Sequence, residues 1–346
     1  MLKHIQINGY KCLEKCELAL APLTLLVGPN SSGKSTVIQA ILLVFSPLDQ
    51  KNLPYLKEVV KPFSQFEDVY CRYSNAREIG INIDAENGRY AIILNRSKME
   101  IAMSPEATLP VYEETLFYLS AGRSGPEEIS ELDKDMRIGQ HGQYALGFLE
   151  LCKDKPVHPT LIHPGAHAKT LKAQLAWWLS FIVGSETEAR TEKITATSVK
   201  TTFHAGGIEN ISPLNTGAGN SYAIKLLIMC LTANPGDLLL IENPEIHLHP
   251  GAQSRVASLL AFMAARGVQI VVETHCEHLI NRIRYEIYKK QLPGKDAIIH
   301  YKPSAQESFE TLHVNERGHF CDNTGREKPF PNGFFDSTLA ELLEIS

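Results

Sequence analysis

Hydrophobic and polar positions follow different patterns in successive parts of the chain. Residues 1–45 contain a strand, a turn, a second strand, a glycine-rich loop and an apolar helix. The segments "EIGINIDA" and "RYAIILNR" alternate apolar and polar positions on either side of Asn87 and Gly88, which predicts a β-hairpin. The segment "TLFYLSAGRSGP" predicts a buried strand that runs into a loop carrying Arg123.

The middle of the chain has helical spacing. The segments "QYALGFLELC" and "LKAQLAWWLSFIVG" predict two helices, with "HPTLIHPGAH" as the loop between them. Trp177 and Trp178 are expected in the core of this lobe. A sustained heptad pattern is missing from the sequence here, so a long coiled-coil arm is not expected.

The last part alternates helical and buried-strand patterns. "SYAIKLLIMCLTA" predicts a helix, "DLLLIENPE" a buried strand, "GAQSRVASLLAFMAARG" an amphipathic helix that ends at Gly267, and "VQIVVETH" a further buried strand. This β-α-β alternation is typical of a parallel sheet.

The glycine-rich loop "GPNSSGKST" fits the pattern G-x-x-x-x-G-K-[ST], with a predicted strand before it and a helix after it. In that context backbone N–H groups and the positive end of the helix face an anion. Lys34 is expected to reach the β- and γ-phosphates of a nucleotide, and the hydroxyl of Ser35 to bind Mg²⁺. The expected nucleotide contacts in this loop are Asn30, Ser31, Ser32, Gly33, Lys34, Ser35 and Thr36.

A phosphate loop needs a distant acid that holds Mg²⁺ from the other side, usually at the tip of an apolar strand. The segment "LLLIENPEIHLHP" supplies Glu242 directly after Leu238–Ile241. Ser35 and Glu242 are therefore the expected magnesium ligands.

Composition narrows the class of protein. The chain has 346 residues, of which 44% are hydrophobic and 21% charged, and its net charge of −5 provides no overall attraction to nucleic acid or to an acidic membrane. The sequence contains neither a signal-peptide pattern nor an apolar run long enough to span a bilayer, so a cytoplasmic protein is expected. Seven scattered cysteines indicate reduced thiols, and Cys12 and Cys16 lack a second pair at zinc spacing.

The combination of "GPNSSGKST", "IENPEIHLHP" and "VVETHCEHLINRI" resembles the ABC-type ATPases of the SMC, RecF and OLD (overcoming lysogenization defect) group. The resemblance covers about residues 1–75 and 205–346, and "PFPNGFFDSTLAELLEI" is similar to the C-terminal tail of a bacterial subgroup. It implies an α/β fold: an ABC-type P-loop NTPase head with a mixed sheet, an antiparallel β-subdomain and a helical lobe. The expected parts are an N-terminal head segment over residues 1–120, a helical or inserted lobe over 121–204, a C-terminal head segment over 205–300 and a tail over 301–346.

The resemblance also assigns roles to individual residues. His275 matches the switch histidine that contacts the γ-phosphate, and "NTGAGNS" matches the signature motif, which here contains Gly217, Gly219 and Ser221. Gln65 is a candidate for the loop glutamine that senses Mg²⁺ and water, and Lys11 matches a basic position near the nucleotide. In this family two ATP molecules lie between two heads, so the resemblance implies ATP-dependent dimerisation.

One position departs from the family pattern. The residue after the magnesium acid is usually a glutamate that activates the attacking water, and here it is Asn243. An amide aligns water but does not accept its proton. Glu245 could substitute for the missing base, or it could pair locally. If neither Glu245 nor His275 acts as the base, the protein is a slow ATPase that stays long in its ATP state.

Two further features have alternative interpretations. His247 and His249 could act as zinc ligands, but the resemblance favours structural or nucleotide-facing roles. The segment after His275 carries several cations, and Glu277 and Glu286 among them favour a solvated face over a DNA groove. The cations are Arg282, Arg284, Lys289, Lys290 and Lys295.

Three functions fit these observations. The first is an ATP-driven switch subunit of a bacterial anti-phage defence or genome-maintenance complex, whose partner is a separate nuclease or toxin, because the chain shows no acidic cluster typical of a Toprim nuclease. The second is a RecF-like repair ATPase that binds DNA itself, which needs a positive surface. The third is a transporter ATPase, which would show a fuller signature motif.

Overall fold

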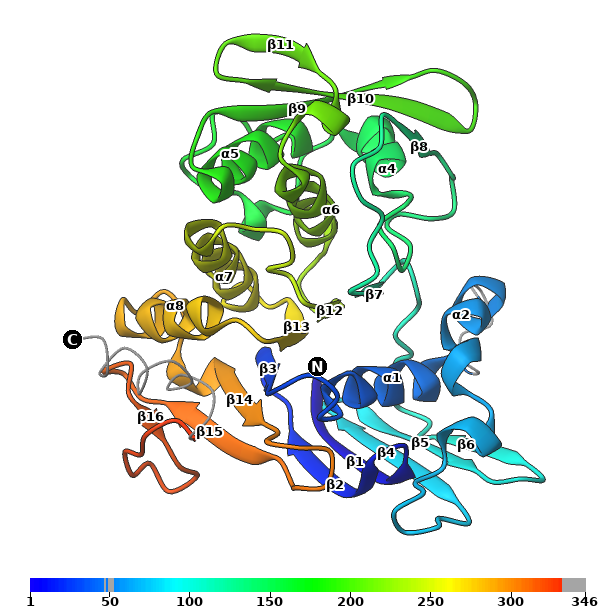
Figure 1. The fold of residues 1–346 in the computed structure, drawn as a ribbon. Coiled ribbons are helices and arrows are strands. Elements are labelled where there is room, and N and C mark those ends of the chain that lie inside the picture. The colour runs from blue at the N-terminus through cyan, green and yellow to red at the C-terminus, as the bar shows by residue number, and fades with distance from the viewer. Residues whose placement is uncertain (47, 49–52, 332–346) are drawn as a thin grey trace, which may run out of the picture. The chain divides into compact units, whose positions relative to one another are not determined.

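The chain forms two compact units. The computed structural model describes residues 1–46, 48 and 53–331. Unit 1 combines Met1–Leu109 with Val271–Ser346, and unit 2 is Pro110–Ile270 (Figure 1). Most of the predicted tail segment "PFPNGFFDSTLAELLEI" lies outside the described residues.

Unit 1 contains an antiparallel sheet with the strand order β2-β1-β4-β5-β6. Its strands are β1 (Leu2–Tyr10), β2 (Leu13–Ala19), β4 (Ile79–Ala85), β5 (Gly88–Leu94) and β6 (Met99–Met103). The predicted hairpin is confirmed, because β4 and β5 pair from Ile79 with Leu94 to Ala85 with Gly88. Strand β6 was not predicted, since all five of its residues are exposed and their pattern shows no buried face.

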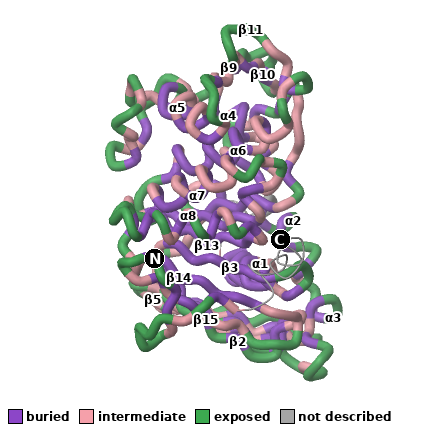
Figure 2. The backbone as a smooth tube through the Cα atoms, turned by 60° about the vertical axis from the view of Figure 1, so that its left-hand side comes forward, coloured by how far each residue is buried: buried purple, intermediate pink, exposed green. Residues whose placement is uncertain are grey.

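The second sheet of unit 1 has the order β16-β15-β14-β3-β13. Its strands are β3 (Leu23–Val27), β13 (Gln269–Thr274), β14 (Ala297–Tyr301), β15 (Glu310–Val314) and β16 (Phe320–Cys321). Strands β3, β13 and β14 are buried throughout and form the purple centre of this unit in Figure 2. Strand β14 pairs parallel to β3. Parallel strands that are buried on both faces are typical of α/β proteins.

Helices cover these sheets. Helix α1 (Lys34–Phe45) begins where the glycine-rich loop ends. The ring of its last residue, Phe45, packs edge-on against Tyr90 of β5, with 5.0 Å between ring centroids. The shorter helices α2 (Leu53–Val60) and α3 (Phe66–Val69) follow, and α8 (Glu277–Tyr288) follows β13. In the described ranges, none of the helices has both the length and the apolar character needed to cross a membrane.

Unit 2 has a parallel strand pair, four helices and a separate antiparallel sheet. Strand β7 (Leu116–Leu119) pairs with β12 (Leu238–Glu242), as Leu240 opposite Tyr118 shows. The helices are α4 (Ala145–Cys152), α5 (Leu171–Val183), α6 (Ala218–Thr232) and α7 (Pro250–Ala264). All four helices agree with the predicted helical segments. Trp178 is buried in the core of the lobe as expected, whereas Trp177 is partly exposed.

The antiparallel sheet of unit 2 was not predicted. It is built around β10 (Ser198–Ala205), which pairs with β8 (Ile129–Glu131), β9 (Thr187–Lys193) and β11 (Ile208–Ile211). Strand β9 reads "TEARTEK", with only Thr187 and Thr191 buried, so its buried face carries no apolar signal. The region expected to be helical therefore also contains strands. Helices α4 and α5 pack against one of them, β9.

Candidate functional site

The phosphate loop of unit 1 has a backbone that only glycine permits at two points. Gly28 and Gly33 have φ values of 144° and 106°, and a side chain on Gly28 would lie 2.2 Å from the carbonyl oxygen of Lys302. Ser31 also adopts a positive φ, of 61°. Positive φ values at Gly28, Ser31 and Gly33 are typical of a tight turn in which successive amides can face an anion.

Helix α1 starts directly at Lys34, and among the described residues no side chain caps its first turn. The amide groups at this end thus keep their capacity to bind an anion. Ser32, Lys34 and Thr36 are buried, whereas Asn30 and Ser31 are exposed. Lys34 Nζ donates to the carbonyl oxygen of Pro29 at 2.6 Å, which folds the ammonium back over the loop.

Two residues from the end of β13 join the phosphate loop in unit 1. His275 Nδ1 lies 2.8 Å from the carbonyl oxygen of Gly28. Glu273 Oε1 lies 3.8 Å from Lys34 Nζ and 3.9 Å from His275 Nε2. The structure thus brings His275 to the loop, and it adds the buried Glu273, which the motif analysis missed.

Lys11 and Gln65 have different surroundings in unit 1. Lys11 Nζ donates to Gln39 Oε1 on α1 at 2.5 Å, about one helical turn beyond Ser35, and lies 5.4 Å from the ring centroid of Phe63. Gln65 is exposed at the start of α3, where its carbonyl accepts a bond from the Asp68 amide. A role for Lys11 beside the phosphate loop therefore has geometric support that Gln65 lacks in the described residues.

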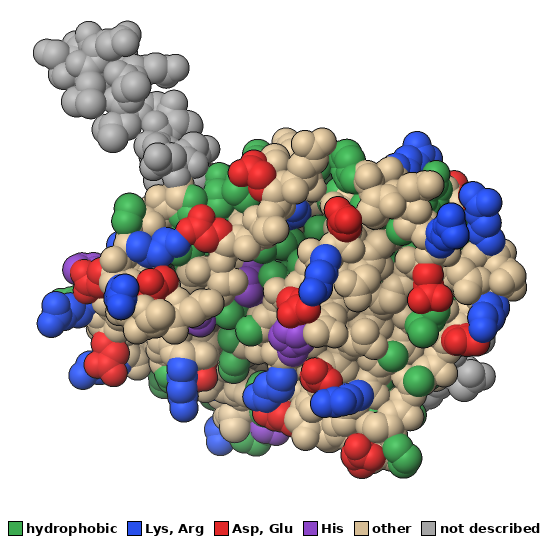
Figure 3. All heavy atoms as spheres, turned by 90° about the horizontal axis from the view of Figure 1, so that it is seen from below, with side chains coloured by type: hydrophobic (Ala, Val, Ile, Leu, Met, Phe, Trp, Pro, Cys, Tyr) green, Lys and Arg blue, Asp and Glu red, His purple; other side chains and the backbone are tan. Residues whose placement is uncertain are grey.

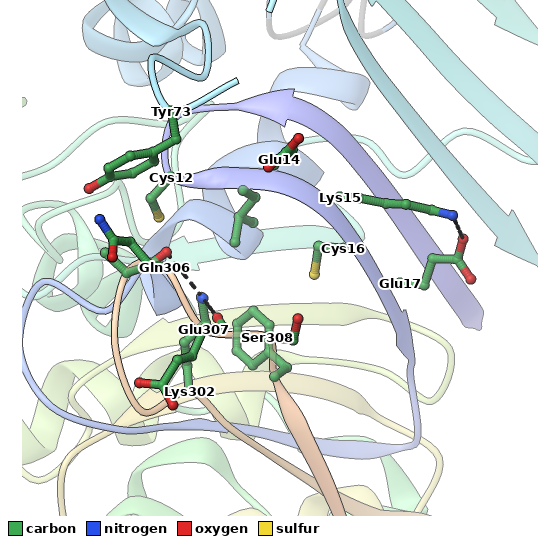
Figure 4. A pocket seen from close by; sticks show the side chains of 13 residues that line it. Cys12, Glu14, Lys15, Cys16, Glu17, Tyr73, Lys302, Gln306, Glu307 and Ser308 are labelled. Carbon is green, nitrogen blue, oxygen red and sulfur yellow. Dashed lines mark hydrogen bonds and ion pairs between the residues drawn. The ribbon is translucent and has the colours of Figure 1, made fainter. Parts of the chain in front are cut away.

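A cavity of about 530 Å³ lies next to the phosphate loop in unit 1 (Figure 4). Cys12, Cys16 and Lys302 line it together with the chain at 305–309. Burial raises the pKa of Cys16 to about 12, with Lys302 acting in the opposite direction. Cys12 Sγ lies 3.9 Å from Thr36 Oγ1, so this thiol packs against the start of α1. Cys12 therefore packs against the phosphate loop, and the reduced state of the cysteines stays a prediction.

In unit 2, the acid Glu242 is held at the tip of β12. Tyr118 donates to its Oε1 at 3.0 Å, and the Ala121 amide donates to its Oε2 at 3.0 Å. Both donors come from β7 and the loop that follows it, beside β12 in the sheet. The carboxylate is 8% exposed, so its orientation is fixed before any ligand arrives.

Arg123 holds the backbone at the same point. Its Nη2 donates to the carbonyl oxygens of Glu242 and, at 2.8 Å, of Asn243, while its Nε donates to Ser120 at 3.1 Å. Burial lowers the pKa of Arg123 to about 10, and the carboxylates of Glu245 and Glu242 act in the opposite direction. Its Nη1 is buried and makes no hydrogen bond with any described residue. Sequence alone placed Arg123 in a loop but did not connect it to the acid.

Asn243 has a φ of 42°, in the left-handed region that asparagine tolerates better than glutamate does. This gives a physical reason for the amide at a position where the family usually has a carboxylate. Glu245 is 8% exposed, and its charge acts on Arg123. This electrostatic attraction is in line with the local-pairing alternative for Glu245, which stays open beside its role as a base.

The signature segment lies at the start of α6 in unit 2. Gly217 precedes the helix, and a side chain on Gly219 would lie 2.9 Å from the carbonyl oxygen of His247. The hydroxyl of Ser221 is buried without a hydrogen-bond partner among the described residues. One helical turn later, the buried Lys225 donates to Glu127 at 2.9 Å and to the Ser124 carbonyl oxygen at 2.9 Å. Lys225 thus ties the signature helix to the loop that carries Arg123.

The two histidines after Glu245 have structural contacts. The ring of His247 packs on Tyr222 of α6, with 4.6 Å between centroids, and His249 caps α7 by accepting the Gly251 amide at 3.3 Å. Within the described chain, histidine, cysteine and acidic side chains form no cluster that could hold a metal ion. These contacts favour the structural interpretation over the zinc interpretation.

The proposed magnesium ligands have the right chemistry. Ser35 offers a hydroxyl and Glu242 a carboxylate, which are the hard oxygen ligands that Mg²⁺ prefers. Ser35 lies in the first turn of α1 in unit 1, and Glu242 lies at the tip of β12 in unit 2.

A phosphate loop before an uncapped helix, and a buried acid at the end of an apolar strand, are the two elements typical of a P-loop NTPase. Comparison with known proteins agrees. The chain belongs to the family described as "AAA domain, putative AbiEii toxin, Type IV TA system", which matches residues 76–281, more than half of the chain. The family described as "AAA ATPase domain" matches residues 1–139. The protein is therefore an ABC-type AAA ATPase of the SMC, RecF and OLD group, whose family implies nucleotide binding and usually Mg²⁺.

Individual proteins match this chain either over a short segment or at low sequence identity. The chain is 52% identical over 44 residues to the OLD nuclease of Thermus scotoductus (strain ATCC 700910 / SA-01), a match that spans 13% of this chain and 8% of that relative. The SMC head bound to the C-winged helix domain of ScpA gives a TM-score of 0.58 at 14% identity, over 91% of this chain and 98% of that chain. The SMC head from Pyrococcus furiosus with an extended coiled coil, bound to the C-terminal domain of ScpA, gives 0.56 at 13% identity over 99% of both chains. These likenesses confirm the predicted fold.

Proposed function

We propose that this chain is a slow ATP-dependent switch that dimerises when it binds ATP and regulates a separate effector. The phosphate loop carries the proposal, because its uncapped helix start and its buried lysine form a preorganised anion site in unit 1. In this scheme ATP and Mg²⁺ bind at Lys34, Ser35 and Glu242, and the signature residues Gly217, Gly219 and Ser221 receive the nucleotide of a second head.

Slow hydrolysis follows from the chemistry at Asn243. The amide there aligns water without accepting its proton, so turnover depends on another group. A long-lived ATP state suits a sensor, since the nucleotide biases the closed state until it is hydrolysed. The hydroxyl of Ser221 is buried and has no hydrogen-bond partner in the described part of the chain, which is consistent with a contact that forms only in the closed dimer.

For a role in a cytoplasmic anti-phage defence complex, the support is one family name and one short match to a relative. The family name includes a toxin of a type IV toxin–antitoxin system, and the short match is to a nuclease. The four-part division at residues 120, 204 and 300 remains part of this proposal. Direct DNA binding of the RecF type has less support, because basic and acidic side chains are interspersed over the face of the molecule in Figure 3 and the net charge is −5.

The proposal is tested by equilibrium dialysis with MgATP and by sedimentation velocity. We expect wild-type protein to bind ATP and to dimerise with it, and Lys34→Ala to lose about 100-fold in affinity, because a charge-assisted contact to phosphate is removed. Lys153→Ala, which removes a surface lysine paired with Glu150, serves as the charge-matched control and should bind normally. Normal ATP binding by Lys34→Ala would contradict the site assignment, and salt-sensitive DNA binding by the isolated chain would favour the RecF-like function.

A further inference from the structure

Strand β13 carries a buried carboxylate beside the phosphate loop. Glu273 is 6% exposed in the otherwise uncharged sequence "QIVVET". Burying a carboxylate is unfavourable unless charged or hydrogen-bonding partners compensate it. The same oxygen, Oε1, lies 3.8 Å from Lys34 Nζ and 3.9 Å from His275 Nε2, so the acid stands between the two groups expected at the terminal phosphates.

The contacts of His275 fix its tautomer. The carbonyl oxygen of Gly28 only accepts hydrogen bonds, so His275 Nδ1, at 2.8 Å, is the donor and carries a proton. The neutral ring then has its lone pair on Nε2, the nitrogen on the side of Glu273. A carboxylate at this distance favours the protonated ring, because the opposite charge stabilises the imidazolium. The Gly28 carbonyl oxygen therefore orients the ring through Nδ1, while the carboxylate of Glu273 lies beside Nε2 and supports a positive charge on the ring.

We propose that Glu273 is a positioning residue that makes His275 the proton acceptor in ATP hydrolysis, an inference that rests on the ATPase function proposed above. The oxygen of the attacking water bonds to the γ-phosphorus while the bond from that phosphorus to the bridging oxygen of ADP breaks. One water proton moves to His275 Nε2, and the imidazolium later releases it to solvent. This route accounts for the residual turnover of the slow switch, because Asn243 itself accepts no proton.

Other charged groups around the histidine bear on this role. Lys34 of α1 shares the Glu273 carboxylate, and the backbone of Lys302, after β14, packs on Gly28. The Lys302 ammonium points elsewhere, because it donates to the carbonyl oxygens of Ser304 at 3.0 Å, Ala305 and Glu307. A bound triphosphate competes with Glu273 for the ammonium of Lys34. Nucleotide binding would therefore strengthen the effect of the carboxylate on His275.

Steady-state ATPase measurements on Glu273→Gln, His275→Asn and the double variant test the proposal. We expect Glu273→Gln to lower kcat about 10- to 100-fold, the range seen when the carboxylate partner of a metal-bound histidine is removed, with little change in KM. The double variant should be no slower than His275→Asn, because Glu273 acts through the histidine. Glu286→Gln is the matched control: Glu286 is 7% exposed in α8 of the same unit and pairs with Arg282 at 2.7 Å. It should leave kcat unchanged.

A second measurement needs no nucleotide. In NMR titrations of histidine-labelled protein, the midpoint for His275 should move to lower pH in Glu273→Gln and stay near the wild-type value in Glu273→Asp, which keeps the charge. An unchanged midpoint in Glu273→Gln, an unchanged kcat, or additive losses in the double variant would overturn the inference and leave ATP binding intact. Failure of the wild-type protein to bind ATP would instead defeat the proposed function.

Discussion

The phosphate loop of unit 1 and the acid loop of unit 2 both present charge at the end of a buried strand, but they are held in different ways. The phosphate loop relies on backbone: Gly28 and Gly33 adopt conformations that a side chain would block, and the first turn of α1 supplies amides. The acid loop relies on side chains: Tyr118 and Arg123 fix Glu242 from outside its own strand. A site built from backbone therefore tolerates substitution least at its glycines, and a site built from side chains tolerates it least at its buried donors.

The largest effect is expected from a glycine of the phosphate loop. Gly28→Ala places a methyl group 2.2 Å from a backbone oxygen at a φ of 144°, so we expect a loss of about 4 kcal/mol in the stability of unit 1, together with loss of ATP binding. Gly217→Ala, at the start of α6, meets nothing within 4 Å and should change stability by less than about 0.5 kcal/mol. Urea unfolding of both variants measures the difference, and equal losses would show that the cost does not come from the backbone conformation of the phosphate loop.

A smaller effect is expected from the arginine of the acid loop. Arg123→Ala removes a donor from the buried carbonyl oxygen of Glu242 and the partly buried one of Asn243, at a cost of about 2–3 kcal/mol. Arg255→Ala is the matched control, since Arg255 Nη1 donates at 3.0 Å to the carbonyl oxygens of Phe181 and Ile182 in the same unit. Both variants should lose stability, but only Arg123→Ala should also lose ATPase activity. If folded Arg123→Ala keeps its ATPase activity, the hydrogen bonds of Arg123 have only a structural role.

The smallest effect concerns pH. Burial lowers the pKa of His300 in β14 to about 4, and its ring is held by Thr311 at 3.0 Å and the Ala19 carbonyl oxygen at 2.8 Å. The unfolded chain binds this proton below about pH 6.5 and the folded chain only near pH 4, so stability is lost as pH falls through that window. At pH 5 the loss is about 2 kcal/mol.

Hydrogen exchange of β14 and β15 amides at pH 7 and pH 5 measures this loss, and His300→Gln should abolish it. His163 of unit 2 is the comparison. Burial lowers its pKa as well, but its ring packs on the partly exposed Trp177, at 3.6 Å between centroids. We therefore expect the stability loss at low pH that His300 causes to be confined to unit 1. If the same loss persists in His300→Gln, another group causes it.

Prediction from sequence succeeded where the signal is local. The hairpin around Asn87 and Gly88 and the four helices of unit 2 were predicted because their apolar spacing and turn residues are read over a few positions. The sheet around β10 was missed, because the buried positions of β9 are threonines and its pairing partners are set by packing. Gln65 matched a family position in sequence, yet its exposed side chain has no contact that identifies a role.

The sequence by itself determined the phosphate loop, the apolar strand before Glu242, the histidine after β13 and the amide at position 243, since each is a matter of residue type and spacing along the chain. Only the tertiary structure decided which residues assist them. Arg123 lies 119 positions before Glu242, and Gly28 lies 247 positions before His275. Contacts between residues so far apart produce no repeating pattern in the sequence. They depend on the order of strands in a sheet and on the pairing of buried charges.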